Sequence, residues 1–193
     1  MYNLLQRLIA LISLILLSPL FLVVAILIKL ESKGPVFFRQ ERVGKDNINF
    51  TIYKFRSMRT DTPDVATHLL DNPDIFITKI GGFLRKTSLD ELPQLLNIVK
   101  GDMLFVGPRP ALYNQYDLNG LRELRGVDKL YPGVTGWAQV NGRDELEIDE
   151  KVEFDKEYLD NRSIIFDIKI VFMTLFKVFK REGIVEGKKV KVK

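Results

Sequence analysis

An uncharged apolar run near the N-terminus, residues 8–28, constrains this chain more than any other feature. At about 1.5 Å per residue, a straight helix over the run would reach roughly 32 Å, close to the ~30 Å hydrocarbon layer of a bilayer. Ser18 and Pro19 stand at its middle. Pro19 lacks an N–H, its ring clashes with the carbonyl of Ile15, and the residue before a proline is displaced from the helical region. The run therefore predicts a membrane segment that is kinked or broken at Ser18-Pro19.

Two arrangements of this segment satisfy the sequence equally well. One is a kinked helix that spans the bilayer, and the other is a hairpin whose arms enter and leave by one face. In either arrangement the Ser18 hydroxyl can bond a freed carbonyl. A signal peptide fits less well, because the run exceeds about 15 apolar residues and no clear cleavage site follows it. Positive charge follows the run rather than preceding it, which favours a cytoplasmic location for the rest of the chain. These cations are Lys29, Lys33, Arg39, Arg42 and Lys45, against Arg7 before the run.

Composition narrows the chemistry of the remaining chain. The net charge of +4 is modest, and an anionic membrane surface and anionic substrates account for it as well as a nucleic acid does. A single histidine, His68, gives little basis for a histidine metal site or a Ser-His triad. A hard cation held by carboxylates, such as Mg²⁺, is the metal that this composition favours. The absence of cysteine fits a reducing compartment.

The patterning predicts an α+β fold that is mainly helical, with a proline-broken membrane helix, a small β-hairpin and amphipathic interfacial helices. We expect the hairpin over residues 36–55 and helices over 89–99, 111–125, 147–160 and 164–181. We expect residues 131–143 to be rich in turns. The boundaries that we expect are a membrane-embedded segment over 1–33, a catalytic domain over 34–185 and a basic tail over 186–193.

Charges interrupt the apolar residues of 164–181 and exclude a membrane span there. A helix with a broad apolar face and flanking basic residues lies in a membrane interface, although a core helix of a folded domain has a similar pattern. The apolar run near the N-terminus favours the interface.

Asp90 and Glu91 are the sharpest local feature, two adjacent carboxylates at the start of a helix and just before Pro93. One interpretation is capping, because Ser88 and Glu91 have capping-box spacing and Asp90 is a suitable N-cap. The other is that Asp90 is a nucleophile or a metal ligand, since an aspartate can attack phosphorus and form an aspartyl phosphoester. A nearby cation would offset the repulsion between the two carboxylates.

Cations and a second acid complete the candidate site. Lys54 and Arg56 alternate along a predicted strand and share a face. Arg109 is fixed between two prolines, and a rigid guanidinium suits phosphate binding. The remaining candidates are Arg85, Arg143 beside a glycine turn, and Asp155.

The order of these pieces closely resembles the bacterial sugar transferase family, the monotopic phosphoglycosyl transferases, over nearly the whole chain. The matching segments are Ser18-Pro19, 38–44, 53–58, 85–95, 100–103, 107–110 and 132–143. The chain resembles the short form of the family, and the resemblance implies a re-entrant membrane helix at Ser18-Pro19. It implies transfer of a sugar 1-phosphate from a UDP-sugar to undecaprenyl phosphate with release of UMP, as the first membrane step of capsule, exopolysaccharide or glycoconjugate assembly.

The resemblance also implies roles for particular residues. Asp90 and Glu91 match the family's catalytic dyad, with Asp90 as the nucleophile that carries the sugar phosphate and as the Mg²⁺ neighbour. Five residues match positions that bind phosphate, nucleotide or metal: Lys54, Arg85, Arg109, Arg143 and Asp155. The implied location is the cytoplasmic face of a bacterial inner membrane, among its lipids. No nucleic-acid partner is expected, and a homodimer is allowed but not specified.

Two alternatives of other classes remain open from the residues alone. A catalytically silent membrane scaffold predicts that Asp90→Asn changes only stability. A basic nucleic-acid binder predicts tight, salt-sensitive binding to DNA or RNA.

Overall fold

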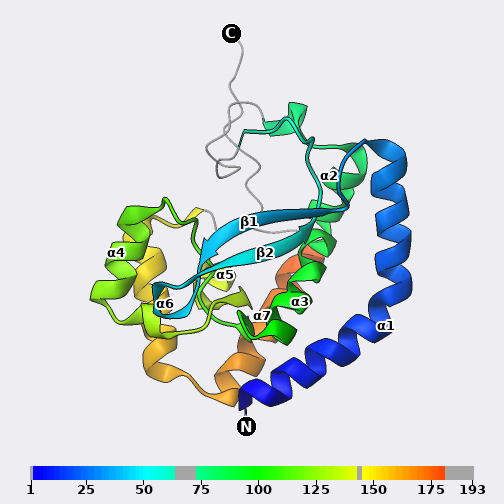
Figure 1. Cartoon of the computed structure of the whole chain (residues 1–193). Helices are drawn as coiled ribbons and strands as arrows, with labels where there is room; N and C mark the ends of the chain where they lie inside the picture. Colours follow the sequence, from blue (N-terminus) through cyan, green and yellow to red (C-terminus); the bar gives the residue numbers. More distant parts are fainter. Residues whose placement is uncertain (1, 64–72, 143–144, 181–193) are drawn as a thin grey trace.

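The computed structural model describes residues 2–63, 73–142 and 145–180, and its architecture confirms the α+β class. Helices surround a two-stranded antiparallel hairpin and a short parallel strand pair (Figure 1). The helices are α1 (Tyr2–Glu31), α2 (Lys79–Lys86), α3 (Leu95–Lys100), α4 (Tyr116–Leu124), α5 (Trp137–Asn141), α6 (Ile148–Asn161) and α7 (Ile164–Lys180). The strands are β1 (Phe37–Val43), β2 (Asn49–Phe55), β3 (Leu104–Val106) and β4 (Gly133–Thr135). Short 3₁₀ turns are η1 (Lys45–Asn47), η3 (Pro73–Ile75), η4 (Leu89–Gln94) and η5 (Val127–Lys129).

Helix α1 continues through Pro19 and changes direction (Figure 1), so of the two expected alternatives the kink is confirmed and the complete break is not found. Figure 1 shows α1 turning about midway along its length. The Ser18 hydroxyl donates a hydrogen bond of 2.8 Å to the Ile15 carbonyl, the group that loses its helical partner to Pro19. This bond confirms the expected role of Ser18 and keeps the helix intact while it bends.

Both arms of α1 pack on the same folded body. Ala10 of the first arm joins a buried cluster with Ile98 of α3, and Val24 and Ile28 of the second arm join another with Phe55 of β2. The opposite side of α1 carries exposed apolar residues along its whole length, and the helix is long and apolar enough to cross a membrane. Water does not favour such a surface, so α1 needs a lipid or protein environment on that side.

The hairpin forms where alternating residues predicted it. Strands β1 and β2 pair antiparallel, and the turn between them places Asp46 and Asn47 at positive φ, which these residue types tolerate. The other edge of β2 is bound by a side chain instead of a strand. Asn97 of α3, fully buried, accepts the Tyr53 N–H at 3.1 Å and donates to the Thr51 carbonyl at 2.7 Å. This contact fixes α3 in register with β2.

A parallel pair of short strands, β3 and β4, was not expected from the sequence. Residues 131–143 were predicted as turns, but they contain β4 and α5. Glycines allow this packing, because a Cβ on Gly136 would lie 2.1 Å from the carbonyl oxygen of Gly107. The strands therefore bring the loop after β3 against β4.

Helix α7 is buried on one side and has an exposed apolar surface on the other. It therefore combines the features of the two expected alternatives, a core helix and an interfacial helix. Ile170 is fully buried in a core cluster with Tyr158 and Val106, whereas Ile165 and Phe172 are 81% and 68% exposed. Asp167 is buried at the start of α7 and accepts hydrogen bonds from the hydroxyls of Tyr158 and Tyr2. The start of α1 is thereby tied to the start of α7 (Figure 1).

The other expected helices are present with shifted ends. The helix expected over 111–125 begins only at Tyr116, and the helix expected over 89–99 begins as the 3₁₀ segment η4. Helix α6 matches its predicted range closely. The sequence analysis did not predict α2, which begins with a hydrogen bond from the Gly81 N–H to the Thr78 hydroxyl.

Candidate active site

The carboxylate pair lies on η4, between α2 and α3. Ser88 precedes it with φ 55° and ψ 16°, a left-handed conformation that is uncommon for a residue with a Cβ. The Ser88 side chain makes no capping hydrogen bond to η4, so the capping-box interpretation is wrong for this segment. The Glu91 side chain is directed to two cations instead of to the backbone.

Glu91 links the strand and the loop that flank it. Its Oε1 lies 2.7 Å from the Lys54 Nζ and 3.3 Å from an Arg109 guanidinium nitrogen. All three side chains are at most about one-third exposed, so water screens these charges less than on an open surface. The pairing brings β2, η4 and the loop after β3 to one point.

Asp90 is buried beside the same cations. Burial raises the pKa of the Asp90 carboxyl and the Glu91 charge raises it further, while the positive charges of Lys54, Arg85 and Arg109 lower it. Lys54, Arg85 and Arg109 act on Asp90 through their charges. A buried carboxylate whose pKa is shifted by burial and by several nearby charges is a candidate functional group.

Lys54 reaches the site because it alternates with Tyr53 and Phe55 along β2. Burial lowers the pKa of the Lys54 amine, and the negative charge of Glu91 opposes that change. The buried Phe55 packs under η4 together with Leu89 and Leu92. Strand β2 and the dyad are therefore held together by both an apolar contact and an ion pair.

Arg109 is presented by a loop in which three successive carbonyl groups, those of Pro108, Arg109 and Pro110, accept hydrogen bonds. The Gly133 N–H donates to the Pro108 carbonyl, Arg122 donates to the Arg109 carbonyl, and Arg42 donates to the Pro110 carbonyl. Pro108 and Pro110 are buried, and each fixes its own φ. The expectation of a rigid backbone at Arg109 is confirmed.

The remaining cations of the sequence analysis separate into two groups. Arg85, in the last turn of α2, lies close enough to Asp90 for its charge to lower the Asp90 pKa, and it also contacts the Met58 sulfur at 3.7 Å. Arg56 does not join the site. Its buried guanidinium donates to the carbonyls of Ser32 and Lys33, which fixes the chain just after α1.

Asp155 is placed differently from the other candidates. It is 1% exposed on α6, and two nitrogens of Arg122 donate to its Oδ2 at 2.7 and 3.0 Å. Burial raises the pKa of Asp155, and Arg122 opposes the change. The sequence analysis missed Arg122, because nothing near it in the sequence resembles a site.

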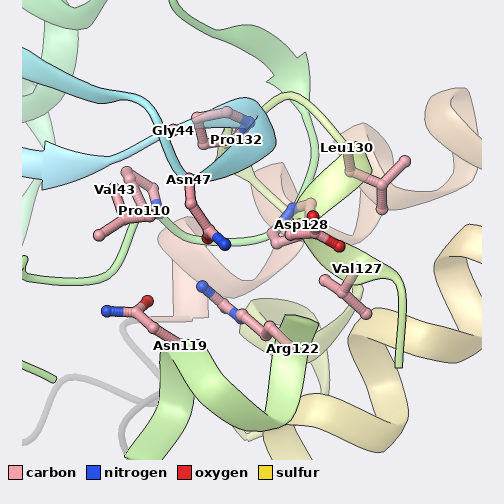
Figure 2. A pocket seen from close by; sticks show the side chains of 11 residues that line it. Val43, Gly44, Asn47, Pro110, Asn119, Arg122, Val127, Asp128, Leu130 and Pro132 are labelled. Carbon is pink, nitrogen blue, oxygen red and sulfur yellow. The ribbon is translucent and has the colours of Figure 1, made fainter. Parts of the chain in front are cut away.

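Arg122 also lines a pocket beside the loop that presents Arg109. Figure 2 shows its side chain between α4 and the hairpin turn, with Asn119, Asp128 and Pro110 around it. The pocket shares Pro108 and Pro110 with the loop that presents Arg109.

Three features of the sequence analysis lie outside the described residues: Arg143, His68 and the expected basic tail.

The carboxylates present suit a magnesium ion that arrives with a phosphate ligand. In the described part of the chain, no group of three or more His, Cys, Asp or Glu side chains is placed to enclose a metal. Mg²⁺ keeps several waters and is usually bound by one or two carboxylates together with substrate phosphates. Asp90 fits that role, because a cation would compensate for its burial, and Glu91 is its adjacent carboxylate.

A buried aspartate, a second acid and three cations lie on the folded body that also packs against an exposed apolar helix, an arrangement that suits phosphoryl transfer at a membrane. The bacterial sugar transferase family model matches residues 1–181, and the chain belongs to this family.

Named relatives are similar over most of this chain. It is 45% identical over 173 residues, 86% of the chain, to the UDP-glucose:undecaprenyl-phosphate glucose-1-phosphate transferase of Escherichia coli K12. It is 44% identical over 167 residues to the sugar transferase EpsL of Bacillus subtilis 168, and 38% identical over 190 residues to the exopolysaccharide production protein ExoY of Rhizobium meliloti. These alignments cover 86% and 89% of this chain. The chain spans 37% of the length of the E. coli relative, 81% of EpsL and 82% of ExoY.

Proposed function

We propose that this protein transfers a sugar 1-phosphate from a UDP-sugar to undecaprenyl phosphate and releases UMP, through a covalent intermediate on Asp90. The observation that carries the proposal is the buried Asp90 carboxylate surrounded by Lys54, Arg85 and Arg109. Relatives named for transfer of glucose 1-phosphate and of N-acetylgalactosamine phosphate to undecaprenyl phosphate support it. Relatives named for exopolysaccharide production support a role in polysaccharide assembly.

The first step is attack by Asp90 on the donor. A carboxylate oxygen of Asp90 bonds to the β-phosphorus of the UDP-sugar, the bond from that phosphorus to the bridging oxygen breaks, and UMP leaves with the electron pair. Arg109 and Lys54 would neutralise charge on the transferring phosphoryl group, and their contacts with Glu91 hold both cations in place before the donor arrives. Mg²⁺ held by Asp90 and the donor's phosphates would supply further neutralisation of the pyrophosphate.

The second step returns the enzyme to its starting state. A phosphate oxygen of undecaprenyl phosphate attacks the same phosphorus, and the Asp90 carboxylate leaves. The acyl phosphoester is a reactive intermediate, so exclusion of water around buried Asp90 limits its hydrolysis.

The acceptor requires that the site lie at a bilayer surface, and α1 supplies this position. Tyr2 at its start bonds Asp167, and Glu31 at its end accepts the backbone N–H groups of Lys79 and Ile80 at 2.6 and 3.0 Å. Both ends of the apolar helix are thus held by one folded body. A re-entrant α1, with the catalytic part on the cytoplasmic face of the inner membrane, satisfies these contacts, whereas a spanning helix would separate its ends by the bilayer.

Mass spectrometry tests the covalent step directly. The purified chain is incubated with Mg²⁺ and one UDP-sugar at a time, without lipid acceptor. We expect UMP release and a sugar-phosphate adduct on Asp90 with at least one donor, and neither with Asp90→Asn. UMP release that occurs only when undecaprenyl phosphate is present would argue for direct transfer in a ternary complex.

Cysteine labelling tests the placement of α1. The chain has no cysteine, so Asn3→Cys and Lys33→Cys each introduce a single reactive thiol, with Asp117→Cys on exposed α4 as the control for the catalytic side. A membrane-impermeant maleimide should label all three from the same side of inverted or right-side-out vesicles. Labelling of positions 3 and 33 from opposite sides would show a spanning helix.

A further inference from the structure

We infer that Asp155 and Arg122 are positioning residues that set the backbone of Arg109, and that Asp155 acts through Arg122 and not by touching substrate. This inference rests on the proposed function. It gives Asp155 a role different from the phosphate, nucleotide or metal contact that the family resemblance implies. The evidence is the chain of contacts from Asp155 to Arg122 to the Arg109 carbonyl.

Each nitrogen of the Arg122 guanidinium already has a protein acceptor. Nε and Nη2 donate to Asp155 Oδ2 at 3.0 and 2.7 Å, and Nη1 donates to the Arg109 carbonyl at 2.9 Å. The Arg122 side chain is 11% exposed and Asp155 is 1% exposed. A substrate would have to displace these partners to reach either charge.

Arg109 is held both at its backbone and at its side chain. Its carbonyl points to Arg122 while its side chain extends to Glu91 at 3.3 Å. The Arg109 backbone is therefore fixed on one side by α4 and α6, and its guanidinium is presented on the other side to the dyad. A planar guanidinium presents separate nitrogens to both partners in a fixed geometry, whereas a lysine offers one compact nitrogen on a flexible stem.

The contact with the Arg109 carbonyl distinguishes the Arg122–Asp155 pair from an ion pair that only joins the two helices. A second ion pair joins α4 and α6 nearby, with Arg125 lying 2.7 Å from Glu153, and both side chains are more than half exposed. Among the contacts of the described residues, Arg122 connects this helix pair to the Arg109 carbonyl, and the Arg125 contact is with Glu153 alone. Arg125→Lys is thus a matched control for Arg122→Lys.

The experiment measures the rate of adduct formation on Asp90 in the full chain, with the UDP-sugar that labels the parent, below the melting temperature of every variant. We expect Arg122→Lys to slow labelling by about tenfold or more, because a displacement of a catalytic group by about 1 Å is enough for such a loss. Arg125→Lys should label at the parental rate. In an Arg109→Lys background, where charge is kept but the fork is lost, Arg122→Lys should slow labelling by less than about twofold.

Each other outcome is decisive. If Arg122→Lys labels as fast as the parent, or slows labelling equally in both backgrounds, the positioning role is wrong while the proposed function stands. If Arg122→Lys melts at a lower temperature but its folded fraction labels normally, the pair serves stability alone and the inference fails. If the parent forms no adduct with any UDP-sugar, the proposed function fails and the inference fails with it.

Discussion

Two aspartates of this protein are buried to a similar degree but surrounded differently. Asp155 receives two hydrogen bonds from Arg122, whereas Asp90 lies among the charges of Lys54, Arg85, Arg109 and Glu91. Burial raises the pKa of both carboxyls. The difference shows that burial alone does not identify a catalytic acid. A carboxylate that is hydrogen-bonded to a guanidinium holds structure, and a buried carboxylate among several charges is suited to chemistry.

The largest expected effect separates the two aspartates by activity. Asp90→Asn should lower turnover by about 10³-fold or more, as removal of a nucleophile does in other enzymes. Asp155→Asn should lower the turnover of its folded fraction by about tenfold, because it loosens Arg109 but leaves the nucleophile. UMP release with UDP-sugar and undecaprenyl phosphate measures both. Equal losses for the two variants would contradict the distinction.

The next effect separates them by stability. Asp155→Ala should lower the free energy of unfolding by about 3 kcal/mol or more, because it leaves the Arg122 charge buried without its carboxylate. Glu153→Ala, which removes the exposed partner of Arg125 from the same helix, should cost less than about 1 kcal/mol. Denaturant unfolding in one detergent, with the two variants side by side, makes this comparison.

A third prediction concerns the pH dependence of labelling. Attack requires ionised Asp90, and its raised pKa places the acidic limb of the labelling rate above the ordinary range of an aspartate. Lys54→Met removes a charge that lowers the Asp90 pKa, so the limb should move to higher pH. Lys129→Met, at an exposed ion pair with Asp46, should leave the limb in place. If the acidic limb of Lys54→Met stays at the parental pH, Lys54 does not influence the ionisation of Asp90.

The smallest expected effect is a gain in the free energy of unfolding for Asp90→Asn, opposite in sign to the loss expected for Asp155→Ala. Because the pKa of Asp90 is higher in the folded chain than the ordinary 3.8, its contribution to stability falls as the pH rises from 3.8 through the folded-state value. At neutral pH its ionised form therefore destabilises the fold. Asp90→Asn should raise stability there by about 1 kcal/mol, and this gain should vanish near pH 3. Thermal unfolding at the two pH values measures it.

The sequence was a good guide where a local rule was decisive. Alternation in residues 36–55 predicted the hairpin, the Pro19 and Ser18 chemistry predicted the bend and the hydroxyl contact, and the prolines around Arg109 predicted a rigid loop. The family pattern brought Lys54, Arg85, Asp90, Glu91 and Arg109 forward as one site, and the structure places these five together. Local rules failed at Ser88, where capping spacing did not produce a cap.

What the sequence by itself determined is the apolar helix, the acid pair and the order of the cations, because each depends on neighbours along the chain. Only the tertiary structure decided which partners the charges take. Arg122 and Asp155 are far apart in sequence, and so are Lys54 and Glu91, yet each pair meets through helix and strand packing. Burial strengthens an ion pair only when geometry aligns it, and no local pattern encodes that alignment. The proposed division, with Asp90 in the chemistry and Asp155 in positioning, therefore depends on the partners that the fold gives to each carboxylate.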